Sequence, residues 1–169
     1  MVQQVTRVSR DGWADGLGGE GPATKARIND FYQILDFATE PEPQVFRQMK
    51  ERARKYSQAL KASLIKALKQ YQTTIIATHV PPYERAAWHE GSPSSPDYQP
   101  FFSSPTLGNM IKAAATEHPG KSVLVLCGHT HSPGIYRDGN ILVLTAGARY
   151  GFPDIAKTIH LDRLGSIFE

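Results

Sequence analysis

The sequence predicts an α/β domain in which helices pack on a β-sheet. One long segment has apolar residues at helical spacing, and several short segments are rich in β-branched and aliphatic residues. The expected order along the chain is loop, helix, strand, helix and three further strands. We expect residues 1–169 to form one domain, because this length buries a substantial core and no linker divides it.

The longest predicted element is an amphipathic helix over Gln44–Tyr71. Pro43 suits its first turn, and Glu42 is favourable near the positive end of the helix dipole. Its apolar residues recur at steps of three or four, which places them on one face. These residues are Val45, Met49, Ala53, Tyr56, Leu60, Leu64, Leu68 and Tyr71.

Four segments are predicted to form buried or paired strands. Thr73–Thr78 and Ser122–Cys127 are apolar runs of strand length. Gly134–Arg137 and Ile141–Thr145 flank the turn sequence Asp138-Gly139-Asn140, which predicts a β-hairpin.

The remaining elements have weaker patterns. Ile155–Leu161 alternates apolar and polar residues and predicts a last strand, and Gln4–Val8 predicts a short first one. Ile28–Phe37 is predicted to be a short helix or strand. Leu107–Glu117 is predicted to be a helix, with Thr106 as its cap.

Two loops are long enough to carry function. Asp11–Pro22 is glycine-rich but lacks the spacing of a phosphate-binding loop, so we favour an ordered surface loop pinned by Trp13. Tyr83–Thr106 is rich in Pro, Ser and aromatic residues, and loops of this length are usually functional or disordered.

The charge distribution argues against nucleic acid as a partner. The net charge is +3 and the pI about 9.0, with Lys and Arg concentrated in Arg47–Lys69. One basic helix face is more often a solvated surface than a binding site. Tyr56 and Tyr71 fall on the apolar face of this helix, where we expect core residues rather than rings that stack on bases.

The single cysteine, Cys127, excludes an intramolecular disulfide and is expected to be a small buried hydrophobe. No apolar leader follows Met1, and no apolar run is long enough to span a bilayer. We therefore expect no membrane partner and a cytoplasmic location.

Three histidines follow predicted strands. His79 closes the first apolar run, and His129 and His131 come just after the second. Ligands of α/β sheets bind at the carboxyl ends of the strands, and neutral imidazole is the commonest metal-binding side chain. In extended backbone His129 and His131 would point the same way, whereas in a tight turn they could reach two different metals. The pattern predicts a metal site.

These residues also carry a family resemblance. Thr78-His79-Val80-Pro81-Pro82-Tyr83 together with Cys127-Gly128-His129-Thr130-His131-Ser132 resembles the C-terminal motif pair of the calcineurin-like metallophosphoesterases. The similarity covers nearly all of this chain, but only the C-terminal part of a complete family domain. It extends over Asp11–Trp13, His89–Gly91, Pro100–Phe102, Gly139–Val143 and Ala148–Gly151.

The resemblance implies a fold, a cofactor and a reaction. The fold would be a partial metallophosphoesterase-type β-sandwich flanked by helices. A complete site would hold two divalent ions, such as manganese, iron or zinc, with His79 and His129 on one ion and His131 on the other. A hydroxide activated by this binuclear centre would hydrolyse a phosphorylated small molecule or a phosphodiester. His89 and Arg149 are candidates for binding the substrate.

Three family motifs are absent from the sequence: Asp-x-His, Gly-Asp-x-x-Asp and Gly-Asn-His. They carry the carboxylate ligands and the catalytic His of the family, so no catalytic residue is assigned. One hypothesis is a phosphoesterase hydrolase represented by its C-terminal portion, which would expose apolar edges and self-associate. The alternative is a catalytically inactive truncated relative that acts as a binding or regulatory module, or that completes its site with a complementing chain.

Overall fold

Five strands make the main sheet of the computed structural model, which describes residues 5–9 and 11–168. They are β1 (Val5–Ser9), β2 (Thr73–Ala77), β5 (Ser122–Cys127), β6 (Gly134–Asp138) and β7 (Ile141–Thr145). Their order in the sheet is β1-β2-β5-β7-β6. All neighbours pair in parallel except β6 and β7, which form the predicted antiparallel hairpin. The predicted α/β class is confirmed, and Gln4 of the expected first strand lies outside the described residues.

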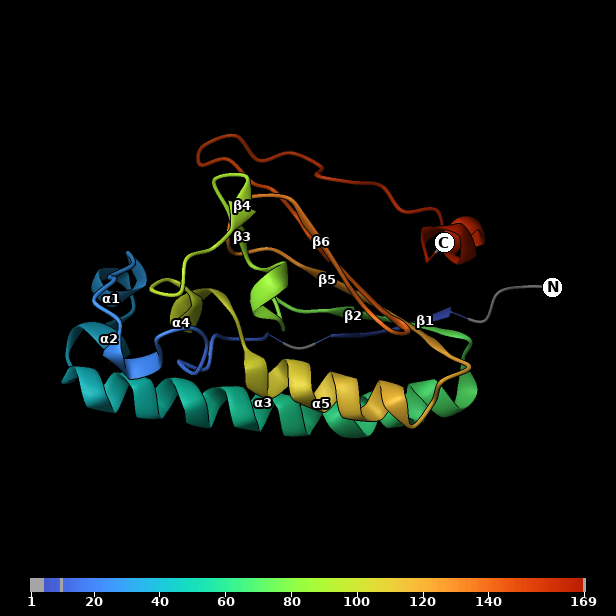
Figure 1. Ribbon diagram of the computed structural model, residues 1–169, viewed down its shortest axis with the longest axis horizontal. Helices are drawn as coiled ribbons and strands as arrows, with labels where there is room; N and C mark the ends of the chain where they lie inside the picture. The colour runs from blue at the N-terminus through green and yellow to red at the C-terminus, as the bar shows by residue number, and fades with distance from the viewer. Residues whose placement is uncertain (1–4, 10, 169) are drawn as a thin grey trace.

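Two helices cover one face of this sheet (Figure 1). They are α3 (Glu42–Gln70) and α5 (Pro105–Thr116), which pack against each other. Pro43 occupies the first turn of α3 and Glu42 lies in that turn, as predicted. None of the described helices combines the length and the apolar character needed to cross a membrane.

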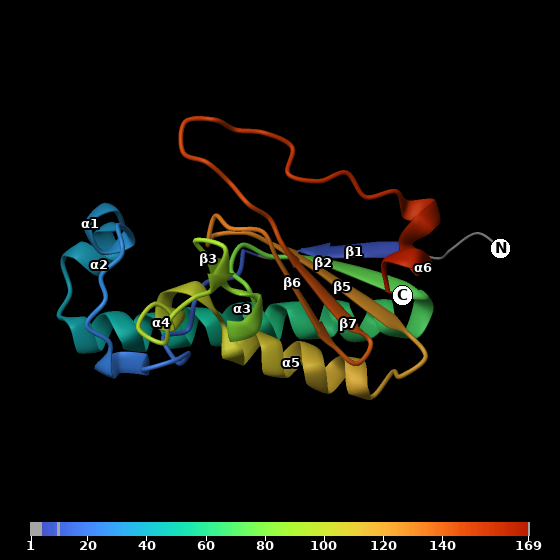
Figure 2. The ribbon, with the colours of Figure 1, turned by 45° about the horizontal axis from the view of Figure 1, so that its top comes forward.

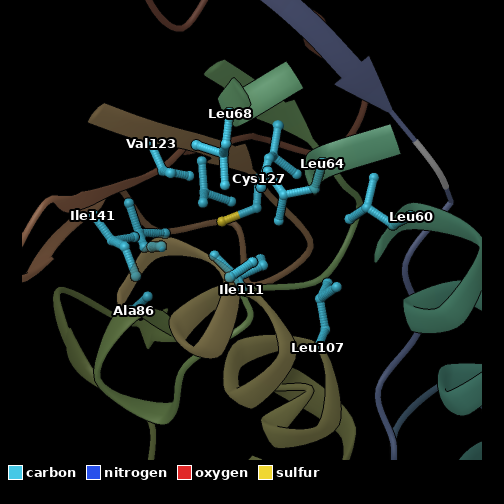
Figure 3. Packing of buried hydrophobic residues seen from close by; sticks show 14 residues of the cluster. Leu60, Leu64, Leu68, Ala86, Leu107, Ile111, Val123, Cys127 and Ile141 are labelled. Atoms are coloured by element: carbon cyan, nitrogen blue, oxygen red, sulfur yellow. The ribbon is translucent and has the colours of Figure 1, made fainter. Parts of the chain in front are cut away.

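The core lies between these helices and the sheet (Figure 3). Leu60, Leu64 and Leu68 of α3 meet Ile111 of α5 and strand residues such as Val123. The predicted apolar face of the helix is therefore confirmed for its aliphatic positions. Tyr56 and Tyr71 are only half-buried, so the expectation that they belong to the core is wrong.

The opposite face of the sheet is covered by the C-terminal segment. This segment leaves the carboxyl ends of the strands and runs back over the sheet toward β1 (Figures 1 and 2). It ends in α6 (Leu164–Ile167), where Leu164 is buried against Ile75, Leu124 and Leu142. No second sheet of comparable size faces the first among the described residues, so the expected β-sandwich is not seen there.

The predicted last strand, Ile155–Leu161, is wrong. Residues 151–160 carry no regular secondary structure, and the side chain of Ile155 is 80% exposed. Alternation favours a strand only where the backbone pairs with a neighbour and one face is buried. Here the segment crosses above the sheet instead of joining its edge (Figure 2).

The remaining connections form short elements. Ile28–Phe37, predicted as a short helix or strand, contains the one-turn helices α1 (Asp30–Gln33) and α2 (Leu35–Ala38, extending one residue beyond). The long loop Tyr83–Thr106 is ordered. It holds a 3₁₀ turn at Glu84–Ala86, the two-stranded pair β3 (Trp88–His89) and β4 (Ser92–Pro93), and α4 (Gln99–Phe102). Further 3₁₀ turns lie at Gly21–Ala23 and Leu161–Arg163.

The start of α5 is held by a distant loop. The expectation that Thr106 caps this helix is wrong, because Thr106 lies inside it. Its backbone N–H donates to Oδ2 of Asp15 at 2.7 Å, while Oδ1 of Asp15 accepts from the N–H of Leu17 at 3.0 Å. The glycine-rich segment is thus an ordered loop, but its residues Gly12, Ala14 and Asp15 are buried rather than on the surface.

Candidate functional site

The ends of β2 and β5 bring His79 and His129 together. The two strands are parallel neighbours, with Ala77 paired to Leu126. Beyond them the N–H of Gly128 donates to the carbonyl oxygen of His79 at 3.0 Å. In consequence Nε2 of His79 and Nδ1 of His129 lie 3.0 Å apart. Two of the three predicted metal ligands therefore meet at the carboxyl edge of the sheet.

Hydrogen bonding fixes the tautomer of His129. Its Nε2 lies 3.0 Å from the carbonyl oxygen of Phe101 and must donate to it, because a carbonyl can only accept. The neutral ring then carries a lone pair at Nδ1, which accepts a hydrogen bond from Nε2–H of His79. An imidazole held by a carbonyl on one nitrogen, with its other nitrogen presented to a site, has the usual arrangement of a metal-binding His.

Burial keeps this pair neutral. The pKa of His129 is lowered to about 4, chiefly because burial disfavours the imidazolium and also because His79 lies beside it. Burial likewise lowers the pKa of His79, against the opposing charges of Asp30 and Asp11. The pKa of Asp30 is raised by its own burial. Neutral imidazoles are the form that binds a metal.

Aromatic rings hold the two imidazoles from both sides. Trp13 stacks on His79 with ring centroids 5.9 Å apart and planes inclined by 17°. Phe102 meets His129 edge-on at 5.6 Å. Gly12 precedes Trp13 and lies close to the end of β2, where a Cβ atom would lie 2.0 Å from Oγ1 of Thr78 and would force that side chain to move.

His131 lies in a tight turn and is separate from the pair. Both His129 and His131 have left-handed backbone, with φ of 71° and 62°, and the N–H of Thr130 donates to Gly128 O at 2.8 Å. Such strained residues cluster at functional sites. The ring of His131 contacts Tyr150 edge-on at 4.4 Å. The tight-turn alternative for the two histidines is the one observed.

The two candidate substrate residues lie in different places. His89 lines the same cavity as the three histidines, and its Nδ1 donates to the carbonyl oxygen of Thr130 at 3.3 Å. Arg149 is exposed and lies over the ring of Phe152 at 4.4 Å. It does not line that cavity, although its neighbour Tyr150 does.

The described residues do not make a complete metal site. Within residues 5–9 and 11–168, no group of three or more His, Cys, Asp or Glu side chains is arranged to hold an ion. The pair of nitrogens on His79 and His129 suits one edge of a coordination shell, but zinc-type sites need three or four protein ligands. Additional ligands would have to come from elsewhere.

Several residues of the site were not predicted from the sequence. Asp30 and Tyr98 line the cavity with the histidines, as does the loop residue Asn29. Among the described residues, Oγ1 of Thr130 and Nε1 of Trp13 are buried without a hydrogen-bond partner in the protein. The Asp30-containing segment lies far from the histidines in sequence and has no motif that would have linked it to them.

Comparisons with known proteins do not identify a family. No family model matches the sequence, and no curated protein sequence matches it. Among solved structures, the chain is similar to GAP50, described as the anchor in the inner membrane complex of Plasmodium. The identity is 18% and the TM-score 0.39, over 60% of this chain and 26% of that chain. The chain thus spans about a quarter of that protein, and a similarity this weak identifies neither fold nor function.

Proposed function

We propose that this chain carries the histidine-bearing part of a metal-dependent phosphoesterase, which hydrolyses a phosphomonoester or a phosphodiester. The observation that carries the proposal is the 3.0 Å separation of Nε2 of His79 and Nδ1 of His129. With metal–nitrogen bonds of about 2.0–2.1 Å, two nitrogens bound at right angles lie roughly 2.9 Å apart. The two nitrogens are joined by a hydrogen bond, and their separation matches that of two ligands on one divalent ion, which would displace the shared hydrogen.

The roles of the chain's own residues follow from their contacts. Phe101 O holds the ring of His129 so that Nδ1 faces His79, and Trp13 stacks on the His79 ring. His131 is the proposed ligand of a second ion. Two divalent ions, when bound, polarise the phosphoryl oxygens and supply a nucleophile at neutral pH. The carboxylate ligands and the catalytic residues would come from outside the described residues.

A second candidate is a binding or regulatory module without catalysis. Because only two of the proposed ligands converge within the described residues, an ion held here would be bound weakly. This module would share the histidine pair and the cavity with the enzyme but would not turn over an ester.

Metal binding and hydrolysis separate the two candidates. We expect titration of the chain with Co²⁺ to show binding in the visible spectrum, weakened roughly tenfold or more in His79→Ala and in His129→Ala. His160→Ala is the matched control, because His160 is exposed and does not line the cavity. Equal binding by all variants would exclude the histidine pair as a metal site.

Hydrolysis of bis(p-nitrophenyl) phosphate with added Mn²⁺ is the second measurement. We expect little turnover by the 169-residue chain alone. When the missing carboxylates are supplied by a complementing chain, turnover should appear, and His129→Ala or His131→Ala should remove most of it. If the chain binds metal but shows no turnover with any complementing chain, the binding or regulatory module is favoured over the phosphoesterase.

A further inference from the structure

We infer that Tyr98 and Tyr150 make this site select phosphoesters of a planar aromatic alcohol. The inference rests on the proposed function and names its substrate class. The relevant cavity has a volume of about 440 Å³ and contains His79, His129 and His131 on its wall. This volume falls in the range of small-molecule sites.

The cavity has little positive charge with which to select a phosphate by itself. Among the described residues that line it, Arg27 is the only Arg or Lys. Its Nη2 donates to Oε2 of Glu42 at 2.5 Å, and its guanidinium lies over the ring of Phe31 at 5.4 Å. Asp30 adds a carboxyl group to the same wall. Phosphate-selective sites usually present an arginine free to form paired hydrogen bonds, which Arg27 is not.

Aromatic side chains form much of the remaining wall. Trp13 and Phe102 are already engaged, since they pack on His79 and His129. Tyr98 and Tyr150 also contact neighbouring rings, Phe102 and His131, but these two residues remain 37% and 79% exposed. Exposed rings beside a cavity can stack on a planar group, whereas a saturated group of the same size gains only the apolar contact.

The two tyrosines border the histidines from different segments. Tyr150 follows β7 in the C-terminal segment and contacts the ring of His131. Tyr98 precedes α4 and stacks on Phe102 at 5.5 Å, which in turn contacts His129. An ester whose phosphoryl group lies at the histidines therefore has an aromatic surface beside its alcohol group.

The test compares two esters that differ in planarity. Phenyl phosphate and cyclohexyl phosphate, with inorganic phosphate as reference, are titrated by calorimetry into the full chain with Mn²⁺. We expect phenyl phosphate to bind about fivefold tighter than cyclohexyl phosphate, as one aromatic stacking contact provides. Tyr150→Ala should bring this ratio close to one, and Tyr150→Phe should preserve it. Binding of inorganic phosphate should be the same in all three proteins.

The outcomes separate this inference from the function on which it rests. Equal affinities for the two esters in the wild-type chain, with phosphate still bound, would overturn the aromatic preference alone. A ratio that survives in both Tyr150→Ala and Tyr98→Ala would overturn the assignment to these rings. Failure of all three anions to bind to the Mn²⁺-loaded chain would overturn the inference, whereas failure of the chain to bind metal in the Co²⁺ titration would overturn the proposed function as well.

Discussion

The two faces of the sheet are covered in different ways. On one face, α3 and α5 enclose a large cluster that includes Leu64, Ile111 and Val125, all without exposed surface. On the other face, the buried cluster that the described residues form around Leu164 is smaller and consists of Ile75, Leu124 and Leu142. The first face is sealed by regular helices, whereas the second is crossed by a segment without regular structure.

An apolar cavity accompanies the weaker face. It has a volume of about 610 Å³ and lies between the sheet and the C-terminal segment, with Leu126, Leu144 and Ile159 on its wall. This cavity is open to solvent, so the C-terminal segment does not pack closely on the sheet along this stretch. The helix-covered face therefore supplies more of the stability, and substitutions on the two faces should differ in their cost.

The largest effect is expected from Leu64→Ala. Leu64 is fully buried between α3 and the sheet, so its truncation should lower the free energy of unfolding by about 3 kcal/mol. Urea denaturation followed by circular dichroism measures this change. Leu35→Ala is the control, because Leu35 is 73% exposed and its loss should cost less than about 0.5 kcal/mol.

Asp15→Ala should be next in size. The carboxylate of Asp15 is buried and accepts from the N–H groups of Leu17 and Thr106. Without this carboxylate the N–H of Thr106 in the first turn of α5 loses its acceptor, so the free energy of unfolding should fall by about 2 kcal/mol. Asp15→Asn keeps one acceptor oxygen and should lose less. A change below about 0.5 kcal/mol in the urea midpoint analysis would argue against this anchor.

Leu164→Ala tests the weaker face directly. Leu164 is also fully buried, yet its cluster is small and the segment that carries it can settle into the space left behind. We expect a loss of about 1.5 kcal/mol, roughly half that of Leu64→Ala. Equal losses in the two variants would show that the faces are packed equally well and would remove the distinction.

The smallest effect is expected from Ile155→Ser. Ile155 is 80% exposed in the segment between β7 and α6. If this segment is unpaired as described, the substitution should change stability by less than about 0.5 kcal/mol in the same assay. A loss above 1 kcal/mol would instead support the strand that the alternating sequence predicted over Ile155–Leu161.

The sequence predicted correctly those elements whose local pattern is strong, and failed where the structure depends on contacts between distant segments. The helix over Glu42–Gln70 and strands β2, β5 and β7 were predictable, because each is long or apolar enough for its periodicity to decide its structure. Ile155–Leu161 has the pattern of a strand but no neighbour to pair with, and pairing is a tertiary property. Thr106 was misassigned as a cap because its real partner, Asp15, is distant in the sequence.

The candidate site was likewise predictable only in part. The positions of His79 and His129 just after two predicted strands indicated that they lie close together, because parallel strands end at the same edge of a sheet. The orientation of His129 depends on Phe101 O, and the surroundings of His131 depend on Tyr150. Those contacts join segments that no local pattern connects, so they became visible only in three dimensions.

The parallel order of the sheet also has a kinetic consequence. Val5 of β1 pairs with Thr73 of β2, whereas β6 and β7 are joined by a short turn. Because closing a long loop costs more entropy than forming a hairpin, we expect β6–β7 to form early and β1 to join the sheet last. The edge of β2 would then stay open for longest during folding, and that edge leads directly to His79.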